Sequence, residues 1–125
     1  MIDDSSTGSQ AALVLPGRFQ PRRYVIGHSE LEIRGPAGSG RVTSLRFFGV
    51  LGVKLKSEYD SLTVAEADQS LRSEVLSFAG VAGRSWARKV RVFVLSEESF
   101  VACLSLVVRE LVDADAPEGK LIYKS

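Results

Sequence analysis

Hydrophobic and polar residues alternate along much of the chain, most clearly between residues 24 and 34. Val25, Leu31 and Ile33 fall on one face of this segment, while polar and charged side chains occupy the other face. A period of two residues with one polar face is typical of a half-buried β-strand. The segment that follows, Gly35–Gly40, is too rich in glycine to hold regular structure and predicts a hairpin loop.

Further apolar runs predict the other strands of a sheet, at residues 11–15, 41–55, 86–95, 100–112 and 120–124. The run over 41–55 is long, and Gly49 and Gly52 within it predict a bulge or a bend. The run over 100–112 is apolar on both faces for most of its length. Gln20–Arg23 is expected to be a connector between the first two strands. The short turns between runs favour antiparallel neighbours.

The hydrophobic period changes to three and four residues near the middle of the chain. Thr63 and Glu66 match a capping box, in which each side chain accepts a hydrogen bond from the other residue's backbone N–H. An apolar stripe at helical spacing follows, formed by Val64, Ala67, Leu71, Val75 and Phe78. Gly80 stands where a left-handed C-cap is expected. These signals predict a helix over about residues 64–79, and the alternative is a short strand over Leu62–Ala65.

The order of these elements, strands then one helix then strands, predicts a mainly β (α+β) fold. We expect an antiparallel sheet or a small β-sandwich of about six to seven strands, with the helix near residues 64–79. A chain of 125 residues is long enough for one ordinary domain and too short for two. Residues 1–10 are polar and are expected to form a disordered tail before a single globular domain over 11–125.

Composition excludes several kinds of site. With 45% hydrophobic and 25% charged residues, the chain resembles soluble globular proteins. One cysteine excludes a disulfide framework and a multi-cysteine zinc site, and one histidine excludes most histidine-based metal centres. Cys103 lies in an apolar run and is expected to be a small core residue. The acidic start is unlike a signal peptide, so a cytoplasmic protein is expected, and the excess of arginine over lysine, eleven to five, is common in bacteria with GC-rich genomes.

Two segments resemble catalytic or phosphate-binding motifs but lack residues that the chemistry needs. Gly27–Leu31 begins like an esterase nucleophile elbow, yet Leu31 stands at the place of the closing glycine and no helix is expected to follow. Gly35–Gly40 has the composition of a phosphate loop without its lysine. It also joins two strands, so no helix N-terminus is present to bind an anion.

Two groups of histidine and acidic residues invite comparison with metal sites. The first lies on one strand face and comprises His28, Glu30 and Glu32. The second lies in one loop and comprises Asp113, Asp115 and Glu118. Neighbours on a strand face are about 6.5–7 Å apart, so a metal would reach only two side chains of the first group. The second group lacks the spacing of an EF-hand loop. We therefore predict no catalytic residues, no metal, no cofactor and no enzymatic activity.

Arginine clusters are the best candidates for contacts with nucleic acid. One cluster consists of Arg18, Arg22 and Arg23, interleaved with Phe19 and Tyr24. A second consists of Arg84, Arg88, Lys89 and Arg91. Clustered cations suit phosphates, and exposed aromatic rings suit bases. The formal net charge is only +1, however, whereas nucleic-acid-binding domains are usually strongly basic. The balance favours ion pairing within the protein or the rim of a protein interface.

The sequence therefore predicts a non-catalytic domain that binds a partner protein or a second copy of itself. One helix can shield only one side of a sheet, and the runs over 41–55 and 100–112 are apolar on a second side as well. The expected interface comprises Phe48, Val50, Val101, Val107 and Trp86, in a homodimer or against a partner. The competing explanation for this face is the internal core of a sandwich.

Two alternative functions stay open. Immunity-type inhibitors of bacterial toxins are often small, cytoplasmic and free of motifs, and the chain resembles them in this general character. A carrier of small apolar ligands would instead enclose a cavity between the sheet and the helix. The side chains expected to line that cavity are Phe47, Phe78, Phe93 and Trp86.

Overall fold

The computed structural model describes residues 12–25, 29–38, 40–112 and 119–125. Within them lie nine β-strands, the α-helix α2 (Gln69–Phe78) and the short 3-10 helix η2 (Ala87–Lys89). The strands are β1 (Leu13–Val25), β2 (Glu30–Gly38), β3 (Arg41–Phe48), β4 (Gly52–Lys54), β5 (Tyr59–Glu66), β6 (Arg91–Leu95), β7 (Ser99–Cys103), β8 (Ser105–Leu111) and β9 (Lys120–Lys124). The predicted class is confirmed, with nine strands in place of six to seven. The tail expected over residues 1–10 lies outside the described residues.

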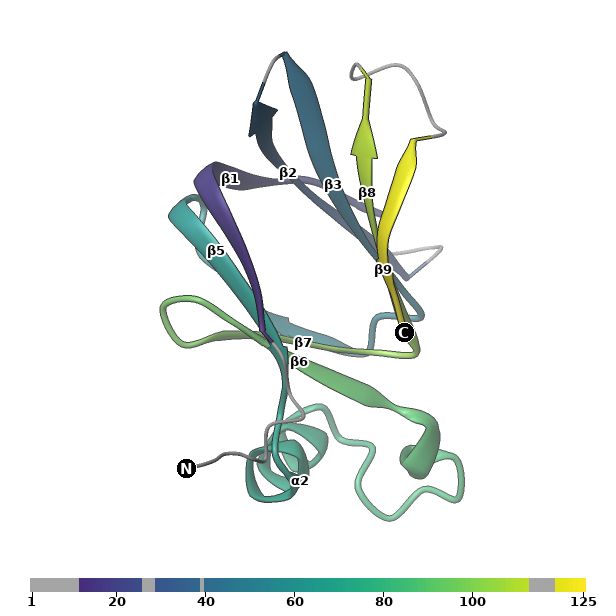
Figure 1. Cartoon of the computed structure of the whole chain (residues 1–125). Coiled ribbons are helices and arrows are strands. Elements are labelled where there is room, and N and C mark those ends of the chain that lie inside the picture. Colours follow the sequence, from purple (N-terminus) through teal and green to yellow (C-terminus); the bar gives the residue numbers. More distant parts are fainter. Residues whose placement is uncertain (1–11, 26–28, 39, 113–118) are drawn as a thin grey trace, which may run out of the picture.

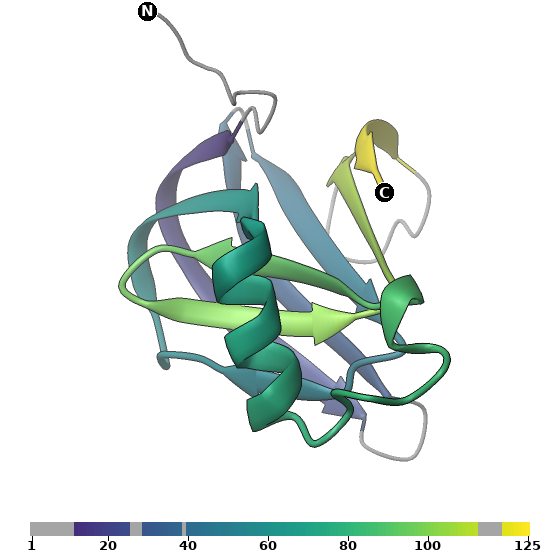
Figure 2. The ribbon, with the colours of Figure 1, turned by 90° about the horizontal axis from the view of Figure 1, so that it is seen from below.

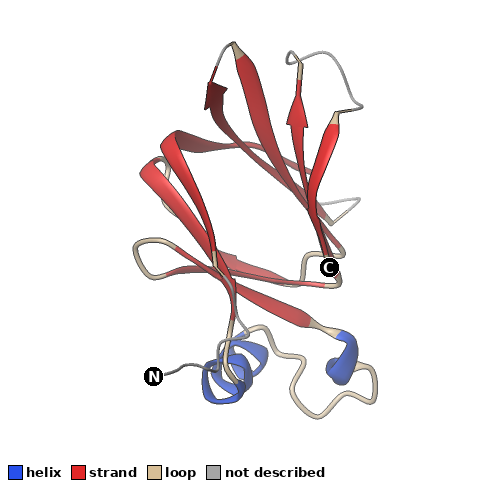
Figure 3. Cartoon of the chain, viewed as in Figure 1, coloured by secondary structure: helices blue, strands red, loops and turns tan. Residues whose placement is uncertain are grey.

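All nine strands form one antiparallel sheet in the order β4-β7-β6-β5-β1-β2-β3-β8-β9. The sheet curls so that its two ends face each other across the core, and α2 packs outside one end (Figures 1 and 3). We call β4, β7, β6 and β5, with the first part of β1, the helix half. The open half comprises the last part of β1 with β2, β3, β8 and β9, and no described helix lies over it.

β1 is the strand that joins the two halves. Its first residues pair with β5 and its last residues pair with β2, with a register shift between Pro16 and Phe19. Gly17 in this shift has a φ of 103°, a conformation that glycine tolerates best. The connector expected at Gln20–Arg23 is therefore part of a continuous strand. The alternation over residues 24–34 spans the end of β1 and the start of β2, two paired strands rather than one.

The two long apolar runs also bend where the chain passes between the halves. The run over 41–55 divides into β3 and β4 at Gly49, whose φ of 66° confirms the predicted bend. A side chain at Gly49 would collide with Leu104, which divides the other run into β7 and β8. The Leu104 N–H donates to the Phe48 carbonyl at 2.9 Å. The two crossings therefore lie side by side and support each other.

The helix begins later than its sequence signals predict. Thr63 and Glu66 lie in β5, so the short-strand alternative is correct for this segment and the capping box does not form. Asp68 is the N-cap residue, and its carboxylate accepts a hydrogen bond of 2.8 Å from the Leu71 N–H. The C-terminal prediction is confirmed, because Gly80 has a φ of 75° and its N–H donates to the Ser77 carbonyl.

Apolar side chains form two buried clusters. The larger one fills the space between the two halves and includes Phe47 and Phe93, whose rings meet edge to face with centroids 6.3 Å apart. The smaller one lies between α2 and the outer face of the helix half and includes Val75, Leu76 and Val92. Figure 2 shows α2 lying across the strands of this half. β6 and β7 are thus largely buried on both faces, which explains their nearly continuous apolar sequences.

The residues of the expected interface do not share one face of the sheet. Val101 is fully buried and Val50 is 6% exposed, and both belong to the core between the halves. The bend at Leu104 shifts the alternation, so Val107 lies half-buried on the outer face of the open half. Phe48, also half-buried, is on this outer face opposite Ser105. The internal core of a curled sheet, the competing explanation, accounts for the second apolar side of β7.

Trp86 lies outside the strand that was expected to begin with it. The strand expected from residue 86 begins only at Arg91, and Trp86 precedes η2. Trp86 is 40% exposed. Trp86 is the one residue of the expected interface that is well exposed.

Candidate anion-binding groove

Charged side chains gather on the outer face of the open half. Strand alternation places Ile33 and Leu45 in the core and turns their neighbours outward. Glu32 on β2 lies opposite Arg46 on β3, and Arg34 lies opposite Ser44 in the same register. This face has no described helix over it, so its side chains meet solvent or one another.

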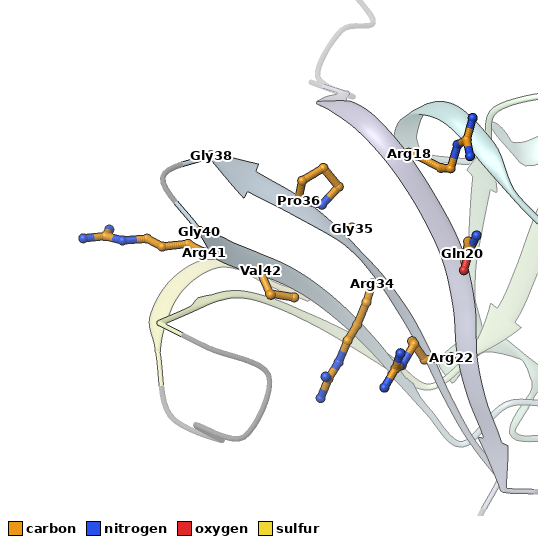
Figure 4. Close-up of a pocket in the computed structure, with 10 residues that line it drawn as sticks. All are labelled: Arg18, Gln20, Arg22, Arg34, Gly35, Pro36, Gly38, Gly40, Arg41 and Val42. Carbon is orange, nitrogen blue, oxygen red and sulfur yellow. The ribbon is translucent and has the colours of Figure 1, made fainter.

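A groove of about 530 Å³ crosses β1, β2 and β3 on this half. We call it the arginine groove, and its lining consists of Arg18, Gln20, Arg22, Arg34, Gly35, Pro36, Gly38, Gly40, Arg41 and Val42. Figure 4 shows the side chains of Arg22 and Arg34 extending from neighbouring strands on the same side, whereas Arg41 points away beyond the β2–β3 hairpin. No acidic side chain is in this lining.

Glu32 supports the groove from beside it. This residue is only 6% exposed, and its Oε2 accepts hydrogen bonds of 2.6 Å from both Arg34 Nε and Ser44 Oγ. Arg46 Nε lies 3.8 Å from the same oxygen. Burial alone would raise the pKa of the Glu32 carboxyl, but the hydrogen bonds from Ser44 and Arg34 and the charges of Arg34 and Arg46 together lower it. Glu32 is therefore an anion at neutral pH.

Glu32 fixes the orientation of Arg34. The Arg34 side chain is 16% exposed and uses Nε to bind Glu32. Within the described ranges, no hydrogen bond from the terminal nitrogens of Arg34 to a protein atom is found. A guanidinium held at Nε presents those two nitrogens as a fork suited to a carboxylate or a phosphate. Little rotamer entropy remains to be lost when such a ligand binds.

The remaining arginines of the groove differ in how they are neutralised. Arg41 donates to Glu110 at 2.8 Å, and its side chain is 54% exposed. Arg18 and Arg22 form no ion pair with any residue that the structure describes. The groove therefore carries an excess of positive charge although the whole chain has a formal charge of only +1.

Glycine and proline shape the floor of the groove. A side chain at Gly35 would collide with the ring of Phe19, which fills the core beneath it. A side chain at Gly17 would collide with the Pro36 ring. The absence of side chains at Gly17 and Gly35 leaves room for Pro36 and Phe19, and arginines of β1 and β2 line the same groove. The hairpin predicted at Gly35–Gly40 is shorter than expected, since β2 continues to Gly38.

The first arginine cluster of the sequence is split by the fold. Arg18 and Arg22 line the groove, and Arg23 is exposed nearby on β1. Phe19, in contrast, is fully buried and cannot stack on a base, while Tyr24 is 46% exposed. The arginine groove thus offers cations without an exposed aromatic ring in its lining.

The second cluster is also divided. Arg91 forms a two-point ion pair with Glu66, with distances of 2.5 Å for Nε–Oε2 and 2.8 Å for Nη2–Oε1. Arg84, Arg88 and Lys89 are exposed around η2. Arg91 is therefore neutralised by Glu66, and only the other three cations of this cluster are grouped around η2.

The two groups of histidine and acidic residues that were compared with metal sites are only partly described by the structure. His28 and the acidic group Asp113, Asp115 and Glu118 lie outside the described residues. Glu30 and Glu32 are described, and the Glu32 carboxylate forms ion pairs with Arg34 and Arg46. No group of three potential metal ligands occurs among the residues that the structure describes.

Cys103 is a core residue, as predicted. It is fully buried in the cluster between the two halves. Burial raises the pKa of its thiol to about 12, so the reactive thiolate is not populated at neutral pH.

The aromatic residues expected to line one ligand cavity lie in different parts of the protein. Phe47 and Phe93 are packed within the core, whereas Phe78 is 65% exposed and Trp86 is 40% exposed. The four rings therefore do not surround a common space.

Comparison of the chain with models of protein families, curated proteins and solved structures finds no match. No helix among the described residues is long and apolar enough to cross a membrane.

Sequence reasoning identified Arg18 and Arg22 but missed Arg34 and Arg41 as their partners. The four residues come from three strands, and only the register of β1, β2 and β3 brings them together. One signal was present: Glu32 and Arg34 are two residues apart on the same strand face, the spacing of a same-face pair.

Proposed function

We propose that the protein is a non-catalytic binding domain that contacts an acidic segment of a partner protein through the arginine groove. The observation that carries this proposal is Arg34, a lining residue of the groove that is held at Nε by the buried Glu32 and extends to the same side as Arg22 (Figure 4). Orienting a cation in this way improves anion binding, because the ordering cost is already met by folding. An inhibitor that acts on a toxin would be one protein of this kind.

Carboxylates are favoured over nucleic acid as the ligand of this groove. Binding to single strands combines backbone contacts with bases stacked on aromatic rings. Phe19, the aromatic residue between Arg18 and Gln20, is fully buried, and the groove lining contains no aromatic residue. An acidic peptide needs only the cations, which bind carboxylates through two parallel hydrogen bonds.

Fluorescence anisotropy with a labelled oligoglutamate peptide tests this proposal. We expect salt-sensitive binding that weakens about tenfold or more when Arg22 and Arg34 are both changed to Ala, because hydrogen bonds to charged groups are strong. Arg88→Ala is the matched control, since Arg88 is an exposed arginine outside the groove. Oligoglutamine is the neutral control peptide.

The same variants can be used in cells of the source organism. A partner protein that is retained by the wild type and by Arg88→Ala, but lost from the double variant, supports the proposal. Equal retention by all three proteins, or an oligothymidylate that binds more tightly than oligoglutamate, would show that the groove does not serve this function.

A further inference from the structure

A second groove lies at the edge of the helix half, between α2 and the strands β4 and β7. Its volume is about 370 Å³. We call it the phenylalanine groove, and it is lined by Lys54, Leu71, Glu74, Val75, Phe78 and Phe100. One wall is α2, and the other is formed by β4 and β7. It therefore lies on a different half of the sheet from the arginine groove.

The centre of this groove is apolar. Val75 is buried at its base, and Phe78 on α2 is 65% exposed. The Phe78 ring meets Phe100 edge to face, with centroids 5.4 Å apart. An exposed aromatic ring beside a half-buried one is the pattern of a contact surface, because aromatic anchors in a polar rim dominate protein interfaces.

The rim of the groove carries one charge of each sign. Lys54 stands on the strand wall and Glu74 on the helix wall. Within the described ranges, neither of them forms an ion pair with another side chain. A two-fold axis through the groove would place Lys54 of one copy opposite Glu74 of the other, and the reverse on the far side.

We infer that two copies of this chain associate through the phenylalanine groove as a symmetric dimer. The surface supplies its own complement, with an apolar centre between opposite charges. The arginine groove lacks this property, because its excess of positive charge would repel a second copy. A dimer built in this way leaves both arginine grooves free, so it could hold a partner that has two acidic segments with higher apparent affinity than a monomer could.

Light scattering or sedimentation over a range of concentrations tests the inference. The wild type is expected to approach twice its monomer mass of 13.6 kDa as concentration rises. Phe78→Glu should remain a monomer over the same range, with an unchanged circular dichroism spectrum, because the ring is largely exposed. Val14→Glu is the matched control, since Val14 is 68% exposed on β1, and it should associate like the wild type.

Charge reversal tests the arrangement of the two copies. Glu74→Lys alone should weaken association about tenfold, because it places two lysines together. Adding Lys54→Glu to that variant should restore association, which happens only if the two positions face each other across the interface. A wild type that stays monomeric at every concentration overturns the inference. So does equal loss of association in Phe78→Glu and Val14→Glu, or a double variant as weak as Glu74→Lys.

Discussion

The two halves of the sheet have inner faces of the same kind and outer faces of opposite kinds. Outward positions of β6 and β7, such as Val92 and Ala102, are apolar and buried beneath α2. Outward positions of β2 and β3, such as Arg34 and Ser44, are polar and bound to Glu32. The residues at every second position thus decide whether a strand pair needs a covering helix or forms a surface for ligands.

The two grooves repeat this contrast in their charges. The charged residues that line the arginine groove are all cations, and one of them, Arg34, is held by a buried anion, which suits a ligand of negative charge. The phenylalanine groove has one charge of each sign around an apolar centre, which suits a copy of itself. Substitutions in the arginine groove should therefore affect ligand binding, whereas substitutions in the phenylalanine groove should affect self-association.

The largest effect is expected where the two halves share one core. Phe47→Ala should lower the free energy of unfolding by about 3–5 kcal/mol, because Phe47 is fully buried against Phe93. Urea denaturation followed by fluorescence or circular dichroism measures it. Phe48→Ala, at the next position on the outer face, should cost clearly less; equal costs would contradict the assignment of faces.

The next largest loss of stability is expected in α2, which covers the outer face of the helix half. Leu76→Ala should cost about 2–5 kcal/mol, because Leu76 is 5% exposed in the cluster beneath α2. Phe78 is on the same helix but is largely exposed, so Phe78→Ala should cost only about 1 kcal/mol, mainly through the lost contact with Phe100. Thermal melts of both variants at a concentration low enough to keep the protein monomeric make the comparison. A large loss in Phe78→Ala would mean that its ring is buried.

The outer face of the open half should respond to loss of its buried anion. Glu32→Ala removes the acceptor of Ser44 and Arg34 and should cost about 1–3 kcal/mol. It should also weaken binding of oligoglutamate, because Arg34 loses its fixed orientation. Arg109→Ala on the same half is a control, since Arg109 hydrogen-bonds the Gly119 carbonyl and does not line the groove. Unchanged binding in Glu32→Ala would show that Arg34 needs no support.

The Glu32 carboxylate should also make the stability of the protein depend on pH in the acid range. The pKa of Glu32 is lower in the folded protein than its ordinary value of 4.5. Its contribution to stability is therefore complete above that value and is lost as the pH falls through the lower, folded pKa. Glu32→Gln should remove this part of the pH dependence, as measured by denaturation between neutral and acid pH. Parallel curves for the two proteins would contradict a lowered pKa.

The smallest effect is expected at the half-exposed ion pair between Arg91 and Glu66. Glu66→Gln should cost less than about 1 kcal/mol, because water screens side chains that are more than one third exposed. The difference should shrink further in high salt. If Glu66→Gln costs more than Glu32→Ala, the exposed ion pair contributes more to stability than the buried carboxylate, and the prediction is wrong.

The sequence predicts the strands better than the crossings between them. Alternation and apolar runs identify the β-rich class because they reflect burial on one or both faces of a sheet. The phase of the alternation is lost at Gly49 and Leu104, where the chain turns from one half to the other. Val101 and Val107 therefore lie on opposite faces, although counting by two places them on one.

The helix shows why a local signal can fail. Thr63 and Glu66 spell a capping box, but Leu62 and Val64 between β1 and β6 are buried in the shared core. Pairing on both sides of β5 outweighs the hydrogen bonds of a cap, and Asp68 becomes the N-cap a few residues later. For the candidate site, the arginines of β1 could be read from the sequence. Their convergence with Arg34 depends on strand register, which sequence reasoning did not provide.

The divided pairing of β1 has a consequence for how the chain folds during synthesis. The last part of β1 can pair at once with β2, its neighbour in the chain. The first part must wait for β5, since Leu13 pairs with Val64, and β3 must wait for β8. Such distant pairings make folding slow, in the range of milliseconds to seconds for β-rich domains. Until β5 emerges, the first part of β1 has an unpaired backbone, and this stage is where misfolding and aggregation are most expected.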